Sequence, residues 1–462
     1  MNPFLNPIFL IRTINAYLNY IDRLNHLSNE DIIKLQNKQL QRMIKRAFSV
    51  QMYYDLYKNA GIGKNDIQSI SDLNNLPIIT KDHFAKYKPE GLVPSSKNIN
   101  QFVKVSTSGT TGKSLSIYVD MYEIIIGLLG YLRTIHDYKI SWRKNRLSII
   151  GDFASHTAET GYVKQGLLPN SISKGAFKSI QWLDTNDPPE KVMDALNSFN
   201  PDFIGGYTGM LGHLAVLKKQ GMGKEVNPKV IASTGALLDN HLKKFIESSF
   251  NSKVFEVYGA TETGPIAYQC ANSGIYHIMS DFLYLEFVDD NNEPVRSKEP
   301  GHILVTKLFG GGTPIIRYNA INDIVSPLYE SHNCNLAGSL IHKIYGRDKI
   351  RLFRKDGKII LASSLTSIFS RLLYQLQTSK IREMKVVQTS LDKIEISIVI
   401  DEKLRNIGPS VDDIYQVFEQ GFKEKFGKSI TVICKEVNQV SRDEPRIISL
   451  VDPSSIRISG FV

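Results

Sequence analysis

Cysteine is scarce in this sequence of 462 residues. It contains Cys270, Cys334 and Cys434 and no other cysteine, and none of the three lies close to another along the chain. Disulfide-stabilised proteins carry more cysteines at closer spacing, so the three cysteines argue against a disulfide framework. Unpaired cysteines are typical of proteins that fold in a reducing compartment, and we therefore expect a cytoplasmic protein.

Long hydrophobic runs are missing as well. No stretch reaches the run of about 18 uncharged apolar residues that a membrane-spanning helix needs. Residues 1–22 are nevertheless apolar. The hydrophobic residues that gather there are Phe4, Leu5, Ile8, Phe9, Leu10, Ile11 and Ile14. We expect this segment to pack onto the core of the protein, and a peripheral contact with a membrane surface or a dimer partner stays open as the alternative.

The charge of the chain gives no sign of a nucleic-acid partner. The net charge is +10, but lysine and arginine are spread along the chain, with no long basic run and no nucleic-acid-binding motif. With 42% hydrophobic and 10% aromatic residues, the composition is that of an ordinary globular protein rather than a disordered or fibrous one. We expect the charge to lie on the solvated surface and predict no nucleic-acid partner.

The order of the apolar segments predicts an α/β fold. Between residues 100 and 345, strand-like runs alternate with helical stretches, and the clearest runs read LSIIGD, PDFIGGY, KVIASTGA and KVFEVYGATE. Three of these runs end in small polar or glycine residues, and ligands of parallel sheets bind at such carboxyl ends. Residues 1–100 are expected to be a helical lead-in, in which residues 30–60 form one amphipathic helix.

A second pattern marks the last part of the chain. Isoleucines alternate with other residues from Ile394 to Ile400, apolar residues follow at helical spacing from Ile414 to Phe422, and ITVIC at residues 430–434 has the composition of a strand. These segments predict a strand–helix–strand module. We therefore expect an N-terminal domain over residues 1–345 and a small α+β C-terminal domain over residues 346–462.

The stretch STSGTTGKSLSIYVD at residues 106–120 has the composition of a phosphate-binding loop. A Walker loop has a glycine five positions before the glycine of its Gly-Lys-Ser, and this sequence has Thr107 there. After Lys113, apolar and polar residues alternate up to Asp120, which predicts a strand rather than the helix of a Walker loop. Glycines let the backbone turn its N–H groups toward an anion, and hydroxyl and lysine side chains add donors and charge. The predicted phosphate loop between two strands comprises Ser106, Thr107, Ser108, Gly109, Thr110, Thr111, Gly112 and Lys113.

Four separated motifs lie in a recognisable order. They are TSGTTGK at residues 107–113, STGA at 233–236, YGATE at 258–262 and GRDK at 346–349. Together they resemble the motifs of the adenylate-forming enzymes. The segments LPIITKDHF, PIIRYNAIND and QCANSGIYH are similar to the phenylacetate–CoA ligase branch and its capsule-biosynthesis relatives. The resemblance spans nearly the whole chain and implies a large N-terminal domain followed by a small mobile C-terminal lid.

The resemblance implies an ATP-dependent ligase. Such an enzyme converts a small carboxylic acid and MgATP to an acyl adenylate, and then passes the acyl group to a thiol such as coenzyme A or to an amine. The capsule-biosynthesis relatives suggest a role in the modification of surface polysaccharides.

The resemblance also implies roles for individual residues. Tyr258 and Gly259 would line the adenine and acyl pockets, and Thr261 would touch the α-phosphate. Glu262 would hold Mg²⁺, because a hard cation prefers carboxylate oxygens. The remaining nucleotide contacts are Gly235 and Ala236 beside the adenine, and Asp323 and Arg347 on the ribose hydroxyls.

The C-terminal domain departs from the family pattern at one position. The family's last motif ends in Gly-Lys, whose lysine bridges the acyl carboxylate and the α-phosphate, whereas SRDEPRIIS places Pro445 and Arg446 there. Arg446 keeps the charge but not the compact ammonium group, and arginine is not a conservative replacement at such a site. We expect a working ligase in which Arg446 takes the place of the lysine. Lys349 corresponds to the hinge about which the C-terminal domain would rotate.

Cysteine and histidine also recur at spacings that suit a metal. Cys270 and His277 are spaced C-x6-H, and His332 and Cys334 are spaced H-x-C. Thiolate and imidazole are preferred ligands of Zn²⁺, and four protein ligands would make the site structural. The resemblance to the paired cysteines of close relatives implies that the four residues would form a zinc site. The alternative is two buried cysteines and two surface histidines.

Two further functions stay open. A family member that lost its catalytic lysine would bind a nucleotide without activating an acid. The apolar segment within residues 1–22 would also suit a membrane-associated interaction protein.

Overall fold

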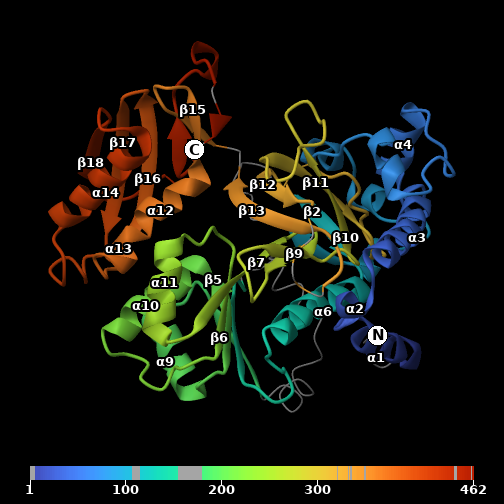
Figure 1. The fold of residues 1–462 in the computed structure, drawn as a ribbon, viewed down its shortest axis with the longest axis horizontal. Coiled ribbons are helices and arrows are strands. Elements are labelled where there is room, and N and C mark those ends of the chain that lie inside the picture. The colour runs from blue at the N-terminus through green and yellow to red at the C-terminus, as the bar shows by residue number, and fades with distance from the viewer. Residues whose placement is uncertain are drawn as a thin grey trace. The chain divides into compact units, whose positions relative to one another are not determined.

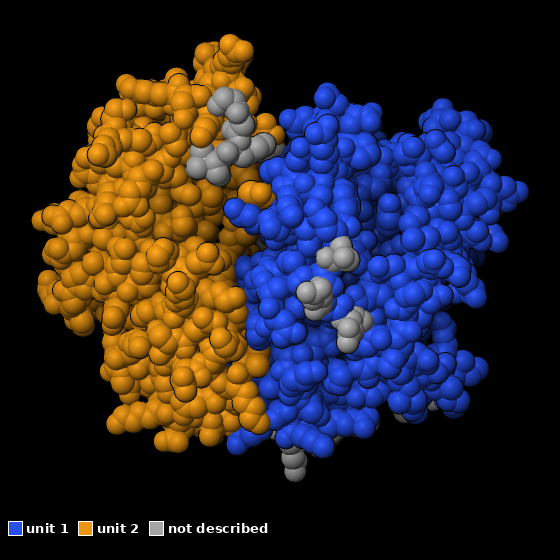
Figure 2. Space-filling view, in the orientation of Figure 1, with its two compact units in different colours: residues 1–186, 202–205, 255–344 blue, residues 187–201, 206–254, 345–462 orange. Residues whose placement is uncertain are grey.

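The computed structural model describes residues 6–106, 115–153, 179–319, 321–330, 332, 334, 336–347, 350–441, 445–458 and 460–461. The chain divides into two compact units, which Figure 2 shows in different colours. Unit 1 comprises Met1–Asn186, Asp202–Gly205 and Phe255–Ile344. Unit 2 comprises Asp187–Pro201, Gly206–Val254 and Tyr345–Val462. Among the described residues, none of the helices combines the length and the apolar character that crossing a bilayer requires.

Helices dominate the first part of unit 1 (Figure 1). They are α1 (Pro7–Tyr20), α2 (Arg23–His26), α3 (Asn29–Ala47), α4 (Gln51–Asn59), α5 (Lys81–Ala85) and α6 (Met121–Asp137). The prediction of one helix over residues 30–60 is wrong, because the chain breaks between α3 and α4. The Ser49 hydroxyl bonds back to the carbonyl of Arg46 at 2.6 Å, and Val50 adopts an extended backbone before α4 begins.

Helix α1 packs against α6 (Figure 1). Ala16 is buried, whereas Ile8, Ile11 and Leu18 are exposed. The expectation that this apolar segment packs onto the core therefore holds for one face of the helix. Phe4 and Leu5 lie outside the described residues.

The first strands of unit 1 follow the sequence prediction. They are β1 (Val103–Ser106), β2 (Ser116–Val119), β3 (Leu147–Gly151), β4 (Ile180–Asp184) and β5 (Phe203–Tyr207), whose last two residues belong to unit 2. β1 and β2 pair antiparallel, so the predicted phosphate loop does connect two strands. β3 pairs in parallel with both β4 and β5, which confirms an α/β arrangement in this region.

The later strands of unit 1 are antiparallel. They are β7 (Lys253–Ala260), β8 (Gly264–Gln269), β9 (Tyr276–Ile278), β10 (Leu283–Val288), β11 (Gly301–Lys307), β12 (Asp323–Leu328) and β13 (Leu340–Arg347). The first two residues of β7 and the last three of β13 belong to unit 2. Their order in the sheet is β10-β11-β12-β13-β9-β8-β7. The described residues from 255 to 344 contain no helix, so the predicted helix–strand alternation up to residue 345 is wrong for this segment. Short turns suffice here because antiparallel neighbours need no crossover helix.

Unit 2 contains the predicted C-terminal module. Its elements are β6 (Val230–Thr234), α9 (Pro189–Phe199), α10 (Thr208–Lys219), α11 (Asn240–Phe250), β14 (Arg351–Phe353), β15 (Lys358–Leu361), α12 (Thr366–Phe369), α13 (Arg371–Tyr374), β16 (Ile381–Ser390), β17 (Lys393–Ile400), α14 (Val411–Phe426), β18 (Thr431–Glu436), β19 (Ile447–Ser449) and β20 (Gly460–Phe461). β17 and β18 pair in parallel on either side of α14 in the sequence. Ile396 on β17 and Phe418 and Phe422 on α14 share one buried cluster, which confirms the strand–helix–strand prediction. The domain boundary at residue 346 stays a prediction.

Candidate active site

The YGATE segment forms a tight turn between two antiparallel strands of unit 1. Tyr258 and Gly259 lie near the end of β7, and β8 begins at Gly264, whose φ is +76°. A β-bulge between Tyr258 and Gly259 changes the register, and such bulges re-aim side chains. A Cβ at Gly259 would press on the carbonyl oxygen of Gly264, so the turn needs glycine there. Glu262 lies in this turn and is buried.

Tyr258 and Asp323 meet in unit 1 although 65 residues separate them along the chain. Asp323 is the first residue of β12 and is 7% exposed. The Tyr258 hydroxyl donates a hydrogen bond to Oδ2 of Asp323 at 2.6 Å. Bonds to an ionised carboxylate are shorter and stronger than those between neutral groups. This bond fixes the orientation of the carboxylate that the motifs assign to the ribose.

Tyr318 is a site residue that the sequence analysis missed. Its hydroxyl donates a hydrogen bond to Oε1 of Glu262 at 2.9 Å. Burial, and then the negative charge of Glu262, raise the pKa of Tyr318, so its hydroxyl stays protonated and acts as a donor. The tyrosine lies inside the PIIRYNAIND segment, but no spacing rule connects it with a glutamate 56 residues earlier.

The neighbours of Tyr318 hold it in place. Ile79 donates its N–H to the carbonyl of Arg317 at 2.9 Å, and Asn319 donates its N–H to the carbonyl of Ile79 at 2.9 Å. The ring of Phe84 packs edge-on against Tyr318 with a centroid distance of 5.8 Å. Two segments that both carry the family resemblance therefore fix the donor to Glu262.

The carboxylate of Glu262 keeps one oxygen for a ligand. Tyr318 bonds to Oε1, and Oε2 has no hydrogen-bond partner among the described residues. An ionised carboxylate oxygen that receives no hydrogen bond from the protein is available to a donor or a cation. Its chemistry therefore fits a hard cation such as Mg²⁺.

Strands β1 and β2 lead into the predicted phosphate loop. Ser106 Oγ lies 3.0 Å from Ser116 Oγ across the pair. Residues 107–114, which include the predicted site residues from Thr107 to Lys113, lie outside the described residues. Their role stays a prediction.

Strand β2 also binds the glycine-rich segment that precedes Tyr318. The N–H of Thr313 donates to the carbonyl of Tyr118 at 2.7 Å, and the N–H of Tyr118 donates to Oγ1 of Thr313 at 3.0 Å. A Cβ at Gly312 would overlap the carbonyl oxygen of Tyr118, so this close approach requires glycine. Strand β2, which follows the predicted phosphate loop, is thereby bonded to the segment that contains Tyr318, the partner of Glu262.

In unit 2, Thr208 holds the turn that is predicted to contact the adenine. Its hydroxyl lies 2.8 Å from Ser233 Oγ and 3.0 Å from the carbonyl oxygen of Ala236. Gly235 has a φ of +83°, and a Cβ there would overlap the ring of Tyr207. The path of this turn therefore depends on glycine at position 235.

Arg347 and Arg446 are exposed residues of unit 2. Arg446 directly precedes β19, and its carbonyl accepts a hydrogen bond from the N–H of Val386 at 2.8 Å. Its Nη1 lies 3.4 Å from Oε2 of Glu383, in an ion pair that is open to solvent and therefore weak. Lys349 lies outside the described residues, so its hinge role stays a prediction.

The predicted zinc ligands lie in unit 1, and some of them are in contact. Cys334 Sγ is 3.4 Å from Nε2 of His277, and the rings of His277 and His332 are 6.4 Å apart between centroids. Burial, and then the nearby His332, lower the pKa of His277 to about 4, so its ring is neutral at pH 7. Cys270 is buried and directly follows β8. Within the described part of the chain, however, no group of three or more Cys, His, Asp or Glu side chains is arranged to hold a metal ion.

Unit 1 thus brings together part of the predicted site. Two hydrogen-bonded pairs lie there: Tyr258 with Asp323, and Glu262 with Tyr318. Thr261 lies in the turn that joins Tyr258 to Glu262. Four other predicted site residues, Gly235, Ala236, Arg347 and Arg446, belong to unit 2.

Comparisons with known proteins agree on the fold. No family model matches the chain. The chain is 21% identical over 439 residues to protein CapK of Staphylococcus aureus, a match that covers 93% of this chain and 90% of that protein. A structure of 2-hydroxyisobutyryl-CoA ligase in the postadenylation state, in complex with 2-HIB-AMP, matches 92% of this chain and 90% of its own, with a TM-score of 0.70 and 17% identity.

A second state of that ligase gives the same result. Its structure with 2-HIB-AMP and CoA in the thioesterification state covers 94% of this chain and 92% of its own, with a TM-score of 0.61 and 16% identity. These matches extend over nearly the whole chain, including the predicted C-terminal domain. The chain therefore has the fold of the adenylate-forming ligases, as its motifs predicted.

Proposed function

We propose that this protein activates a small carboxylic acid with MgATP and transfers the acyl group to a thiol or amine. An oxygen of the substrate carboxylate attacks the α-phosphorus of ATP, the bond from that phosphorus to the bridging oxygen breaks, and pyrophosphate leaves. A thiol or amine then attacks the acyl carbon, loses its proton to solvent, and displaces AMP. Both steps depend on holding and neutralising phosphate charge more than on acid–base catalysis.

The hydrogen bond between Tyr258 and Asp323 is the observation that carries this proposal. A carboxylate can accept hydrogen bonds from both hydroxyls of a ribose. Asp323 is largely buried and is oriented by the Tyr258 hydroxyl at 2.6 Å, so it is prepared to bind such a pair of donors. Pre-organised polar groups of this kind lose little entropy when the ligand binds.

Glu262 is the residue that would hold Mg²⁺. Its Oε1 accepts from Tyr318, and its Oε2 is left for the cation. When bound, Mg²⁺ neutralises charge on the phosphates and so improves pyrophosphate as a leaving group. Tyr318 would orient the carboxylate and remain protonated throughout.

The other site residues have roles that rest on the family resemblance. Lys113 and the loop from Ser106 to Gly112 would bind the β- and γ-phosphates, and Thr261 the α-phosphate. Gly235, Ala236 and Gly259 would border the adenine, and Arg347 would assist Asp323 on the ribose. Arg446 would bridge the acyl carboxylate and the α-phosphate, and Lys349 would serve as the hinge.

The acceptor proposed here is coenzyme A or a related thiol. The solved structure of 2-hydroxyisobutyryl-CoA ligase contains CoA, and its fold matches this chain over nearly its full length. The similarity to protein CapK, together with the motif resemblance to capsule-biosynthesis relatives, favours a role in surface-polysaccharide modification.

ATP–pyrophosphate exchange tests the proposed function. A panel of small aliphatic, 2-hydroxylated and aromatic acids would be assayed with Mg²⁺, and we expect at least one acid to stimulate exchange. Asp323→Ala should reduce this exchange at least about tenfold, because a hydrogen-bonded charged contact to the nucleotide is lost. Glu256→Ala is the matched control, since Glu256 also accepts from a tyrosine, Tyr276, at 2.6 Å in unit 1. Nucleotide binding without exchange for any acid would instead support the non-catalytic alternative.

A further inference from the structure

Helix α1 carries an exposed apolar strip. The strip comprises Leu10, Ile11, Ile14 and Leu18. Leu10, Ile14 and Leu18 are spaced four residues apart and therefore follow one line along the helix, with Ile11 beside them. Leu18 is 71% exposed and Ile11 66%, although α1 is packed against α6 by its opposite side. Such a strip is unusual on a helix whose other face is already packed.

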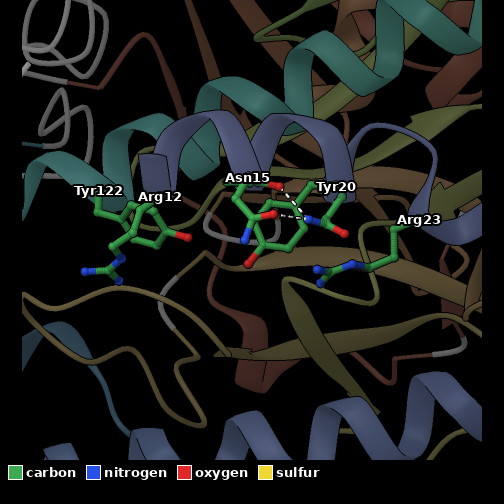
Figure 3. A pocket seen from close by; sticks show the side chains of 7 residues that line it. Arg12, Asn15, Tyr20, Arg23 and Tyr122 are labelled. Atoms are coloured by element: carbon green, nitrogen blue, oxygen red, sulfur yellow. Dashed lines mark hydrogen bonds between the residues drawn. The ribbon is translucent and has the colours of Figure 1, made fainter. Parts of the chain in front are cut away.

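A polar pocket of about 210 Å³ lies along one edge of the same helix. It is lined by Arg12, Asn15, Asn19, Tyr20, Arg23 and Tyr122. Figure 3 shows the guanidinium groups of Arg12 and Arg23 toward opposite ends of this pocket, with the rings of Tyr122 and Tyr20 between them. Arg12, Asn15 and Asn19 follow one another at spacings of three and four residues, so they form a polar row beside the apolar strip.

The pocket carries a net positive charge. Arg12 lies over the ring of Tyr122 at 4.4 Å and has no carboxylate partner among the described residues. Arg23 lies 3.8 Å from Oδ2 of Asp281, but both oxygens of that carboxylate already bind the buried Arg133 at 2.7 Å. Arg23, Arg133 and Asp281 together carry one net positive charge. Arg12 adds a second positive charge.

The acidic residue closest along the chain does not cancel this charge. Asp22 lies between Tyr20 and Arg23 in sequence, and its Oδ1 is 3.4 Å from Nδ1 of His136. Its carboxylate is thus turned toward α6 rather than toward Arg12. The arginine, amide and phenol groups of the pocket are donors that suit a phosphate group.

Tyr17 on α1 contacts a second amphipathic aromatic residue, Trp142. Trp142 donates its indole N–H to the hydroxyl of Tyr17 at 3.1 Å. The exposed Arg143 lies over both rings, 5.2 Å from the centroid of Tyr17 and 5.3 Å from that of Trp142. Tryptophan and tyrosine are enriched where proteins meet the headgroup region of a bilayer, because their rings are apolar and their N–H or O–H groups stay hydrated.

We propose that α1 binds the surface of an anionic membrane, with the apolar strip at the acyl boundary and a lipid phosphate in the pocket of Arg12 and Arg23. Charge complementarity favours an anionic lipid, because the pocket is positively charged. A second copy of this chain would instead bring two positively charged pockets near one another. A helix that lies in the interface needs an apolar face bordered by basic residues, and α1 has both. This inference does not depend on the proposed ligase activity.

Vesicle co-sedimentation of the full chain tests the proposal. The probes are phosphatidylcholine vesicles and phosphatidylcholine vesicles containing about 30% phosphatidylglycerol. We expect binding to the anionic vesicles, which weakens as salt is added, and much weaker binding to the neutral ones. Arg12→Gln should weaken binding about fivefold, and Leu18→Glu at least about tenfold.

Matched controls lie on another helix of the same unit. Ile33 is 47% exposed on α3, and Arg42 is an exposed arginine on that helix. Ile33→Glu and Arg42→Gln should bind vesicles like the unsubstituted protein. Both α1 variants change exposed side chains, so their melting temperatures should match those of the controls, which separates loss of binding from loss of folding.

Three results would overturn the proposal. Equal binding of all variants to anionic vesicles would show that α1 is not the contact. Light scattering that finds a dimer, turned into a monomer by Leu18→Glu while vesicle binding is unchanged, would assign the strip to a second copy. Inorganic phosphate that binds the protein through Arg12 in a calorimetric titration, without any binding to vesicles, would show that the pocket takes a free anion.

Discussion

The Tyr258 hydroxyl lies 2.6 Å from Oδ2 of Asp323, although strands β8, β9 and β13 separate β7 from β12 in the order of the sheet. The residues at the ends of β7 and β12 can meet only because the sheet curves, as twisted antiparallel sheets do. A residue predicted to lie at the adenine and one predicted to lie on the ribose are therefore in direct contact. This contact joins the two motifs within unit 1.

Removing the Tyr258 hydroxyl should weaken nucleotide binding without unfolding the protein. Tyr258→Phe leaves Asp323 without the donor that orients it, and we expect the Kd for ATP to rise about tenfold. Isothermal titration calorimetry with ATP measures the change. Tyr276→Phe removes a comparable tyrosine–carboxylate bond, to Glu256 at 2.6 Å, and should leave ATP affinity unchanged. Equal affinity loss in both variants would indicate a general effect on unit 1 instead.

Arg446→Ala should lower acid-dependent pyrophosphate exchange by about 100-fold, the size expected when one group that stabilises the reacting charge is lost. Its ion pair with Glu383 is exposed and contributes about 0–1 kcal/mol, so the melting temperature should hardly change. Glu383→Ala breaks the same pair but keeps the arginine, and should retain exchange. Unchanged exchange in Arg446→Ala would remove this residue from the mechanism.

A buried ion pair between Glu123 on α6 and Lys307 on β11 should be important for stability. Both side chains are 3% exposed. Glu123→Gln leaves the lysine charge buried without its partner, and we expect the free energy of unfolding to fall by about 3–5 kcal/mol. Chemical denaturation measures the loss.

The double variant Glu123→Gln, Lys307→Met tests whether the loss comes from the unpaired lysine charge. It should recover much of the stability, because no unpaired charge remains buried. Asp187→Asn breaks the exposed pair with Lys191, 2.8 Å long, and should cost at most about 1 kcal/mol. A double variant as unstable as Glu123→Gln alone would contradict this account.

His213 on α10 should make unit 2 less stable at acidic pH, because its protonated ring is unfavourable in the folded state. Burial lowers the pKa of His213 below its ordinary value of 6.5, and its Nδ1 lies 2.8 Å from the Ser379 hydroxyl. The folded state therefore prefers the neutral ring, so this contribution is complete above pH 6.5 and is lost as the pH falls through the folded pKa. Melting temperatures measured from about pH 8 to about pH 5 should fall less steeply in His213→Gln. The exposed His26→Gln should retain the slope of the unsubstituted protein.

Local patterns predicted the parts of this fold that depend on neighbours along the chain. The alternating isoleucines of β17 and the helical spacing of apolar residues in α14 each identify a face that is buried in the structure. Both patterns can be recognised from neighbouring residues alone. The residues after Lys113 predicted β2 for the same reason. The motif order also identified the fold and named Glu262 and Asp323.

Tertiary contacts decided what those patterns leave open. The break between α3 and α4 depends on a serine that bonds back to the helix, and an amphipathic pattern that continues across the break does not reveal it. Tyr318 becomes the partner of Glu262 only because the strands carry two distant segments to the same place. The apolar strip of α1 is exposed because α6 covers only the opposite side of the helix. The sequence by itself determined which side chains are apolar, charged or able to bind a phosphate. The packing of distant segments decided which of these side chains meet and which remain at the surface, because such contacts follow from the curvature and strand pairing of the whole sheet.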